Sequence, residues 1–153
     1  MDIKYINPFI ESFGAVMPQL GFGNVRKDNL SLKQQDLINT GVVIIVGIVG
    51  AIKGNVVYVL DFESAKKIAS TMMMGMPISE LDEISQSALS ELTNMLTANA
   101  ATVFATLGIP VDISTPTLLY GDNIAIKMSS NQVLSIQLLA DEIPIEVNIA
   151  FES

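Results

Sequence analysis

The sequence contains no cysteine and no histidine. Without cysteine there is no disulfide, no thiolate nucleophile and no Cys-ligated metal. Without histidine there is no His-containing hydrolase triad and no His-ligated metal. Any chemistry must therefore use carboxylates, amides, hydroxyls or lysines, and only a hard cation bound by oxygen atoms stays open as a metal ligand set.

Basic residues are also scarce, since eight Lys and Arg face sixteen Asp and Glu and the net charge is -8. A general nucleic-acid binder needs a basic patch, and an anionic membrane surface repels an acidic protein. Residues 1–5 do not resemble a signal peptide, and the apolar stretch Gly41–Ile52 is too short to span a bilayer. We therefore expect a cytoplasmic protein with neither nucleic acid nor membrane as a partner.

Half of the 153 residues are hydrophobic, which is enough for one sizeable core, and the length fits a single domain over residues 1–153. Three segments combine apolar residues at helical spacing with capping residues or glycine stops at their ends. The predicted helices are Asp2–Leu20, a second that Asp61 caps and that runs to Met74, and a long one that begins within Ser79–Asp82 and ends at Leu107.

Runs of β-branched residues between short turn sequences predict the strands. They are Thr40–Ile52, Val56–Leu60, Thr117–Tyr120, Ile124–Met128, Val133–Ala140 and Ile145–Phe151, with the polar segment Asn24–Gln35 as either a strand or an exposed loop. Strands joined by short hairpins are antiparallel. The sequence therefore predicts a two-layer α+β fold, in which helices cover one face of a largely antiparallel sheet. A helix ending in Leu-Gly followed by strands occurs twice, at Leu20 and at Leu107, which indicates a weak internal two-fold duplication.

The long predicted helix has two distinct faces on a helical wheel. The face expected to pack on the core contains Leu81, Ile84, Ala88, Leu92, Met95, Leu96 and Val103. A narrow second stripe on its flank contains Ser87, Glu91, Asn94 and Ala98. Glu91 offers a fixed acceptor for a cation, and Asn94 offers both a donor and an acceptor one turn further on. Spacing alone does not distinguish such a pair from ordinary solvated surface residues.

The pattern Ser87-x3-Glu91-x2-Asn94-x21-Pro116 resembles the signature of the CheC/CheX/FliY family of chemotaxis phosphatases. That family carries Asp or Ser, then Glu, then Asn on one helix, with a proline downstream. Further segments resemble the family in order along nearly the whole chain: 50–58, 72–76, 88–95 and 107–117. Threonine at position 93 and Ala98 stand where the family often has glycine; the methyl group of Ala98 lies where a partner is expected to approach.

The first predicted helix decides which branch of the family the chain resembles. The CheC branch usually has two active helices and the CheX branch one. Asn7, Glu11 and Gly14 repeat the spacing of the stripe, but glycine stands in the place of the amide. The apolar faces of the two helices are not expected to superpose in that register. The chain therefore resembles CheX, and this resemblance implies a homodimer, for which the terminal strand Ile145–Phe151 offers one possible contact.

The resemblance implies a reaction and a partner. The reaction is hydrolysis of the aspartyl phosphate of a phosphorylated CheY-like response regulator, which ends a chemotaxis signal. Asn94 is expected to orient the attacking water and Glu91 to contact the regulator's lysine, with Ser87, Ala98 and Pro116 as further partner-binding residues. The resemblance implies no cofactor of the chain's own, because the regulator carries the Mg²⁺.

Two other functions remain open from the sequence. One is a module that binds a regulator, or that acts like the middle domain of a flagellar switch protein, without catalysis; retention of both Glu91 and Asn94 favours the enzyme. A stand-alone enzyme for small molecules is the weakest alternative, because a chain without histidine or cysteine shows no pocket chemistry.

Overall fold

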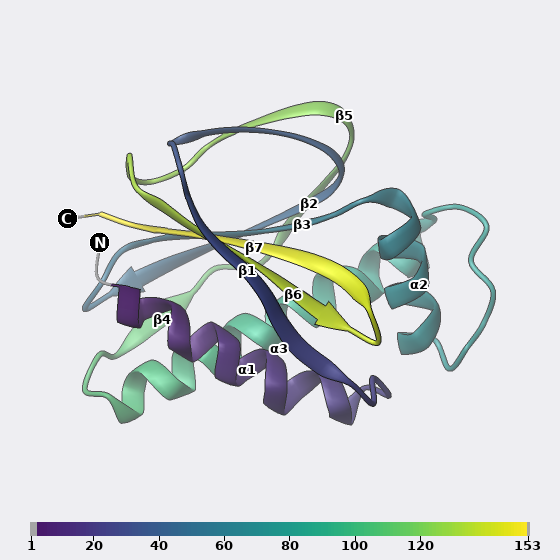
Figure 1. The fold of residues 1–153 in the computed structure, drawn as a ribbon, viewed down its shortest axis with the longest axis horizontal. Coiled ribbons are helices and arrows are strands. Elements are labelled where there is room, and N and C mark those ends of the chain that lie inside the picture. Colours follow the sequence, from purple (N-terminus) through teal and green to yellow (C-terminus); the bar gives the residue numbers. More distant parts are fainter. Residues whose placement is uncertain (1–2, 153) are drawn as a thin grey trace.

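The computed structural model describes residues 3–152, and its strands form one twisted sheet with helices packed on one face (Figure 1). The helical elements are a 3-10 turn, Ile3–Ile6, and the helices α1 (Asn7–Gln19), α2 (Phe62–Met72) and α3 (Glu83–Thr106). The strands are β1 (Val25–Lys33), β2 (Asp36–Gly50), β3 (Gly54–Leu60), β4 (Val111–Ile113), β5 (Thr117–Lys127), β6 (Val133–Ala140) and β7 (Ile143–Phe151).

The strand order is β1-β6-β7-β3-β2, and both β4 and β5 then pair with β2. Each of these pairings is antiparallel. The main hydrophobic cluster lies between this sheet and the helices, with side chains from α1, α2 and α3. The α+β prediction is therefore confirmed. The terminal strand β7 lies between β6 and β3, so both of its edges are already paired and it is not available for pairing with another chain.

The predicted duplication is visible in the sheet order. The chain runs α1-β1-β2-β3 in its first half and α3-β5-β6-β7 in its second. Exchanging β1 with β5, β2 with β6 and β3 with β7 reproduces the same sheet, read from the other edge. The pseudo-two-fold axis therefore passes between β3 and β7, and the outer strand of each half pairs with a strand of the other half.

The strand boundaries differ from the prediction in the second half. The segments predicted as separate strands, Thr117–Tyr120 and Ile124–Met128, form the single strand β5. The expected turn between them is a bulge, because one extra residue of β5 is inserted opposite β2 between Gly121 and Ile124. Positive φ angles at Gly121 (147°) and Asn123 (52°) accommodate it. The polar segment Asn24–Gln35 is mostly a strand, β1.

The helices agree closely with their predicted bounds. Of the helix predicted over Asp2–Leu20, Asp2 lies outside the described residues, Ile3–Ile6 is a 3-10 turn and the α-helix begins at Asn7. The carboxylate of Asp61 accepts a hydrogen bond from the backbone N–H of Ser64, as expected of the N-cap of α2.

The face that α3 buries matches the predicted one only in part. Leu81 and Met95 of the predicted face do pack against the core. Of the seven residues assigned to the core, Leu92 and Leu96 are fully buried, whereas Ile84 is 65% exposed. The buried face instead contains Ser85, Leu89, Leu92, Thr93, Leu96, Thr97, Ala100 and Phe104. The helical-wheel prediction left serine and threonine out of the core face because their side chains are polar. Inside the fold these hydroxyls have partners, since Thr97 donates to the Thr93 carbonyl (2.7 Å) and Thr93 to the Ser90 carbonyl (3.0 Å).

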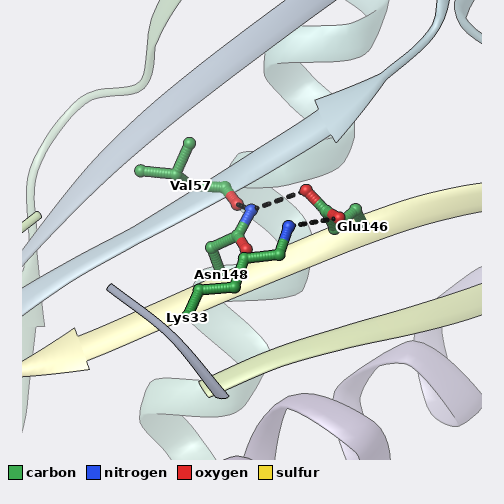
Figure 2. Close-up of polar contacts among 4 residues, drawn as sticks. All are labelled: Lys33, Val57, Glu146 and Asn148. Carbon is green, nitrogen blue, oxygen red and sulfur yellow. Dashed lines mark hydrogen bonds and ion pairs between the residues drawn. The ribbon is translucent and has the colours of Figure 1, made fainter. Parts of the chain in front are cut away.

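The sheet face turned away from the helices carries a second, smaller hydrophobic cluster that includes Val57 and Ala150. A polar network crosses this face (Figure 2). The fully buried Asn148 donates through Nδ2 to the Val57 carbonyl (3.3 Å) and to Glu146 (3.1 Å), and Glu146 also contacts Lys33 Nζ (2.7 Å). This network connects the edge strand β1 to the central strands β7 and β3.

Candidate functional site

The helix α3 begins at a strong cap that fixes where its first turn lies. The carboxylate of Asp82 accepts from the Ser85 backbone N–H (2.9 Å) and from the Ser85 hydroxyl (2.8 Å). The backbone hydrogen bond, followed by the hydroxyl bond, holds the pKa of the Asp82 carboxyl below its ordinary value. A carboxylate at this position also interacts favourably with the helix dipole.

Two hydroxyl contacts hold the underside of α3 against the rest of the fold. The Tyr58 hydroxyl, buried in β3, lies 2.8 Å from the Thr97 hydroxyl, and burial raises the pKa of Tyr58 well above its usual range. From α1, the buried Ser12 hydroxyl donates to the Leu96 carbonyl. These contacts fix the rotation of α3 about its axis, and with it the direction in which its outer face points.

A hollow of about 680 Å³ lies between the first half of α3 and the β4–β5 segment. Its α3 wall is polar and its opposite wall is partly apolar. The lining residues are Glu83, Gln86, Ser87, Ser90, Glu91 and Asn94 on α3, and Ile113, Ser114, Thr115, Pro116 and Leu118 on the other side.

The wall opposite α3 is held in place by Ser114. Its backbone N–H donates to the Gly47 carbonyl (2.9 Å), and its hydroxyl accepts from the Gly47 N–H (2.8 Å). A Cβ at position 47 would lie 3.3 Å from the Ser114 hydroxyl, so glycine allows the two segments to pack closely here. The segment that carries Pro116 is therefore fixed to β2 at the edge of the hollow.

The structure brings together four of the five predicted site residues. Ser87, Glu91, Asn94 and Pro116 all line the hollow; Ser87 and Glu91 are exposed, while Asn94 and Pro116 are half-buried. The fifth, Ala98, is exposed one turn further along α3 and lies outside the lining. Within residues 3–152, no hydrogen bond or ion pair occupies the side chain of Glu91 or Asn94. A carboxylate and an amide one turn apart are therefore free to engage another molecule.

The charge of the lining limits what the hollow can hold by itself. Two glutamates, Glu83 and Glu91, line it together with neutral residues, and no lysine or arginine is among the described lining residues. A phosphoryl group placed here would have its charge neutralised only by cations that arrive with it.

Sequence reasoning missed several residues of the hollow. Gln86 and Ser90 follow the same helical spacing as the stripe and were identifiable from the wheel, had its core face been placed correctly. Ser114 and Thr115 had no local signal, because their position depends on the pairing of β4 with β2, more than sixty residues away in sequence.

The helix α1 matches α3 more closely than the sequence predicted. We expected the apolar faces not to superpose when Glu11 is aligned with Glu91, and this was wrong. In that register five of the six buried positions of α1 coincide with buried positions of α3, and the sixth, Pro8, falls opposite the half-buried Ala88. The coinciding pairs are Phe9 with Leu89, Ser12 with Leu92, Phe13 with Thr93, Val16 with Leu96 and Met17 with Thr97. The two helices are therefore equivalent, and Gly14 stands where α3 has Asn94.

Two further properties concern metal binding and membranes. In the described part of the chain, no group of three or more acidic side chains could hold a metal ion. None of the helices within residues 3–152 is both long enough and apolar enough to cross a membrane.

The two-layer fold and the Glu91–Asn94 pair on α3 match what the resemblance to the CheC/CheX/FliY phosphatases implies. The family model described as chemotaxis phosphatase CheX matches residues 42–139. The CheY-P phosphatase CheX of Thermotoga maritima is 34% identical over 128 residues, covering 83% of this chain and 82% of that protein. The chain belongs to the CheX family.

Solved structures show the same similarity. A CheC-like superfamily protein from Shewanella sp. PV-4 has a TM-score of 0.87 at 26% identity, with all of both chains covered. CheX in the CheX–CheY–BeF₃–Mg²⁺ complex of Borrelia burgdorferi has a TM-score of 0.83 at 27% identity, covering 99% of this chain and all of that one.

Proposed function

We propose that this protein hydrolyses the aspartyl phosphate of a phosphorylated CheY-like response regulator, acting as one domain over residues 1–153 in the cytoplasm. The observation that carries the proposal is the pair of side chains, Glu91 and Asn94, that have no partner among residues 3–152 and lie at the hollow between α3 and the β4–β5 segment. Membership of the CheX family supports the same substrate, because the relative from T. maritima is a CheY-P phosphatase.

The reaction needs a water molecule placed in line with the bond that breaks. The water oxygen attacks phosphorus, the bond from phosphorus to the regulator's aspartate oxygen breaks, and the aspartate leaves as a carboxylate while phosphate is released. Such transfer passes through a loose transition state, so catalysis is mostly positioning and electrostatics. The Asn94 amide can accept from the water and donate to a neighbouring oxygen at the same time, which fixes the direction of attack.

Glu91 fixes the orientation of this protein relative to the regulator. Its carboxylate is exposed and lies one turn before Asn94, so it can pair with the lysine that flanks the regulator's phosphoaspartate. Because no basic side chain of the described residues lines the hollow, the lysine and the Mg²⁺ that neutralise the phosphoryl charge come from the regulator. Ser87 and Pro116 then contact the regulator at the rim, and Ala98 contacts it one turn beyond.

Phosphate release from a phosphorylated CheY-like regulator tests the proposal. The regulator is phosphorylated with a small acyl-phosphate donor, the donor is removed, and inorganic phosphate is followed with and without this protein. Release faster than the regulator's own rate is the expected result. Binding without faster release would favour the non-catalytic interaction module instead.

Changing Glu91 is expected to weaken both binding and turnover. With Glu91→Ala, the ion pair to the regulator's lysine is lost, and kcat/KM should fall about tenfold to a hundredfold. Glu91→Lys should be worse, since it places like charges together. Dissociation constants and steady-state kinetics measure both effects. The control is Glu63→Ala, since Glu63 is exposed on α2 and does not line the hollow; equal losses in both variants would contradict the role of Glu91.

We further propose that the protein is a homodimer that associates through β1. This strand is at the edge of the sheet and, among the described residues, pairs only with β6. Leu30 and Leu32 are 42% and 75% exposed on it, beside a hollow that Ile3 and Leu134 also line. An edge strand with unpaired backbone groups and apolar side chains is suited to pairing with the same strand of a second copy.

A lysine on β1 is expected to separate the dimer. Leu32→Lys puts a charge on the proposed interface, and the dimer dissociation constant should rise at least about tenfold. Light scattering coupled to size-exclusion chromatography measures the mass over a dilution series. Ile38→Lys, at a residue of β2 with 71% exposure, is the matched control and should stay dimeric. A dimeric Leu32→Lys variant would locate the interface elsewhere.

A further inference from the structure

We propose that Ile84 and Tyr120, one beside each wall of the hollow, are apolar contacts that set affinity for the phosphorylated regulator. The inference rests on the proposed function, and it adds the residues outside the hollow that recognise the regulator's surface. Both side chains are large, apolar over most of their area and largely exposed, at 65% for Ile84 and 56% for Tyr120.

Ile84 extends the stripe that carries the site. It lies seven residues, or two helical turns, before Glu91 and therefore points in nearly the same direction from α3. Because α3 begins at Glu83, Ile84 lies in its first turn, next to the polar residues of α3 that line the hollow. A mostly exposed isoleucine contributes little to the hydrophobic core, and a β-branched residue has only modest helix propensity. Neither core packing nor helix formation therefore explains why isoleucine stands at position 84.

Tyr120 lies beside the opposite wall. It follows Leu118 by two residues in β5, and the pairing of this part of β5 with β2 is regular, from Tyr120 opposite Val42 to Leu118 opposite Ile44. Alternate residues of a strand point to the same face, so Tyr120 and Leu118 project to the same side of the sheet. Leu118 lines the hollow, whereas Tyr120 projects next to it into solvent. Tyrosine combines a large apolar ring with a polar tip, which suits a surface that is wet when free and covered when bound.

The size of an ordinary protein interface places Ile84 under the regulator, and Tyr120 is two residues along β5 from Leu118, which lines the hollow that the regulator covers. A partner that takes Asn94 into its phosphorylation pocket covers about 800 Å² of this protein, a disc of radius roughly 16 Å. Ile84 is ten residues from Asn94 along α3, or about 15 Å at the helical rise. Tyr120 is about 7 Å along its strand from Leu118 in the hollow. Leu107, which is 60% exposed at the C-cap of the same helix, is thirteen residues from Asn94, about 20 Å away, and falls outside the disc.

Kinetics with the phosphorylated regulator test the inference. Ile84→Ala and Tyr120→Ala should each raise KM about tenfold, because each removes one apolar side chain from a covered surface. In both variants kcat should stay within about twofold of wild type, because Asn94 and Glu91 are intact. Ile84→Leu and Tyr120→Phe keep the apolar area and should bind like wild type. Leu107→Ala is the control of equal exposure and should change neither constant.

A second measurement separates this inference from the proposed function. Binding of the CheY-like regulator loaded with Mg²⁺ and beryllofluoride, measured by titration calorimetry, needs no turnover. A tenfold weaker complex for both alanine variants supports the docking surface even if no phosphate is released, which would refute only the enzymatic step. Unchanged binding and unchanged KM in both variants, with active wild-type protein, would overturn the docking surface and leave the phosphatase proposal in place.

Discussion

Replacing Asn94 by alanine should reduce phosphate release from a phosphorylated CheY-like regulator to the regulator's own rate. The amide is the group proposed to orient the attacking water, and no other amide on α3 lines the hollow except Gln86, whose Nε2 already donates to the Leu81 carbonyl. Removing one preorganised polar group from such a site typically lowers kcat by about a hundredfold to a thousandfold. A loss of at least about a hundredfold, in single-turnover release of phosphate, is therefore expected.

Binding should distinguish the loss of chemistry from the loss of the complex. Asn94→Ala removes no charge and no buried core contact, so the dissociation constant for the Mg²⁺- and beryllofluoride-loaded regulator should change by less than about threefold. The matched control is Asn99→Ala, since Asn99 lies on the same helix and does not line the hollow. Full activity in the Asn94→Ala variant would refute the assignment of the water-orienting role.

Replacing Asn148 by aspartate should destabilise the fold more than most single substitutions. Asn148 is fully buried, and its Nδ2 group donates both to the Val57 carbonyl and to the Glu146 carboxylate (Figure 2). Aspartate has the same shape as asparagine, but it replaces the Nδ2 donor with a carboxylate oxygen that can only accept. The new carboxylate also lies next to the carboxylate of Glu146. An uncompensated buried charge costs roughly 3–5 kcal/mol, and urea unfolding at neutral pH measures the difference from wild type.

The loss of stability in Asn148→Asp should depend on pH in a defined direction. Burial and the neighbouring Glu146 disfavour ionisation, so the introduced carboxyl has a folded pKa above its unfolded value of about 3.9. Below that value the carboxyl is neutral in both states, and the deficit relative to wild type should be smallest. The deficit should then grow as the pH rises through about 4 and level off above the folded pKa.

Asn55→Asp is the matched control for this experiment. The Asn55 side chain uses its oxygen to accept from the Ser129 N–H (3.1 Å), and a carboxylate can accept the same bond. Its stability should change by less than about 1 kcal/mol, with little dependence on pH. Equal losses at positions 55 and 148 would show that the donor of Asn148 has no special role.

The sequence allowed the site to be predicted better than the packing beneath it. Helical spacing is local, so it placed Ser87, Glu91 and Asn94 on one stripe of α3, but only the resemblance to the phosphatase family singled out Glu91 and Asn94 within that stripe. The buried face of α3 was not fully identifiable, because whether a threonine hydroxyl lies inside depends on partners such as Tyr58, which comes from a different element. The bulge in β5 was predicted to be a turn. Gly121 and Asn123 have positive φ angles, and glycine and asparagine favour such angles in turns as well as in bulges.

The comparison of α1 with α3 shows the same limit. On sequence alone, Ser12 and Thr93 were not identifiable as buried, so the two helices were predicted to have different apolar faces. Their burial reveals the equivalence, and it makes Gly14 the informative difference between them. A Cβ at Gly14 would meet nothing within 4 Å, so packing does not require glycine there.

The interleaved sheet also governs how the chain can acquire its structure during synthesis. The edge strand β1 leaves the ribosome early, yet its only partner among the described strands, β6, is more than a hundred residues later. The central pair, β3 with β7, is separated almost as widely. Contacts this distant in sequence form slowly because the intervening chain must first be closed into a loop. The strands β1 and β3 therefore have unpaired edges until β6 and β7 have been translated.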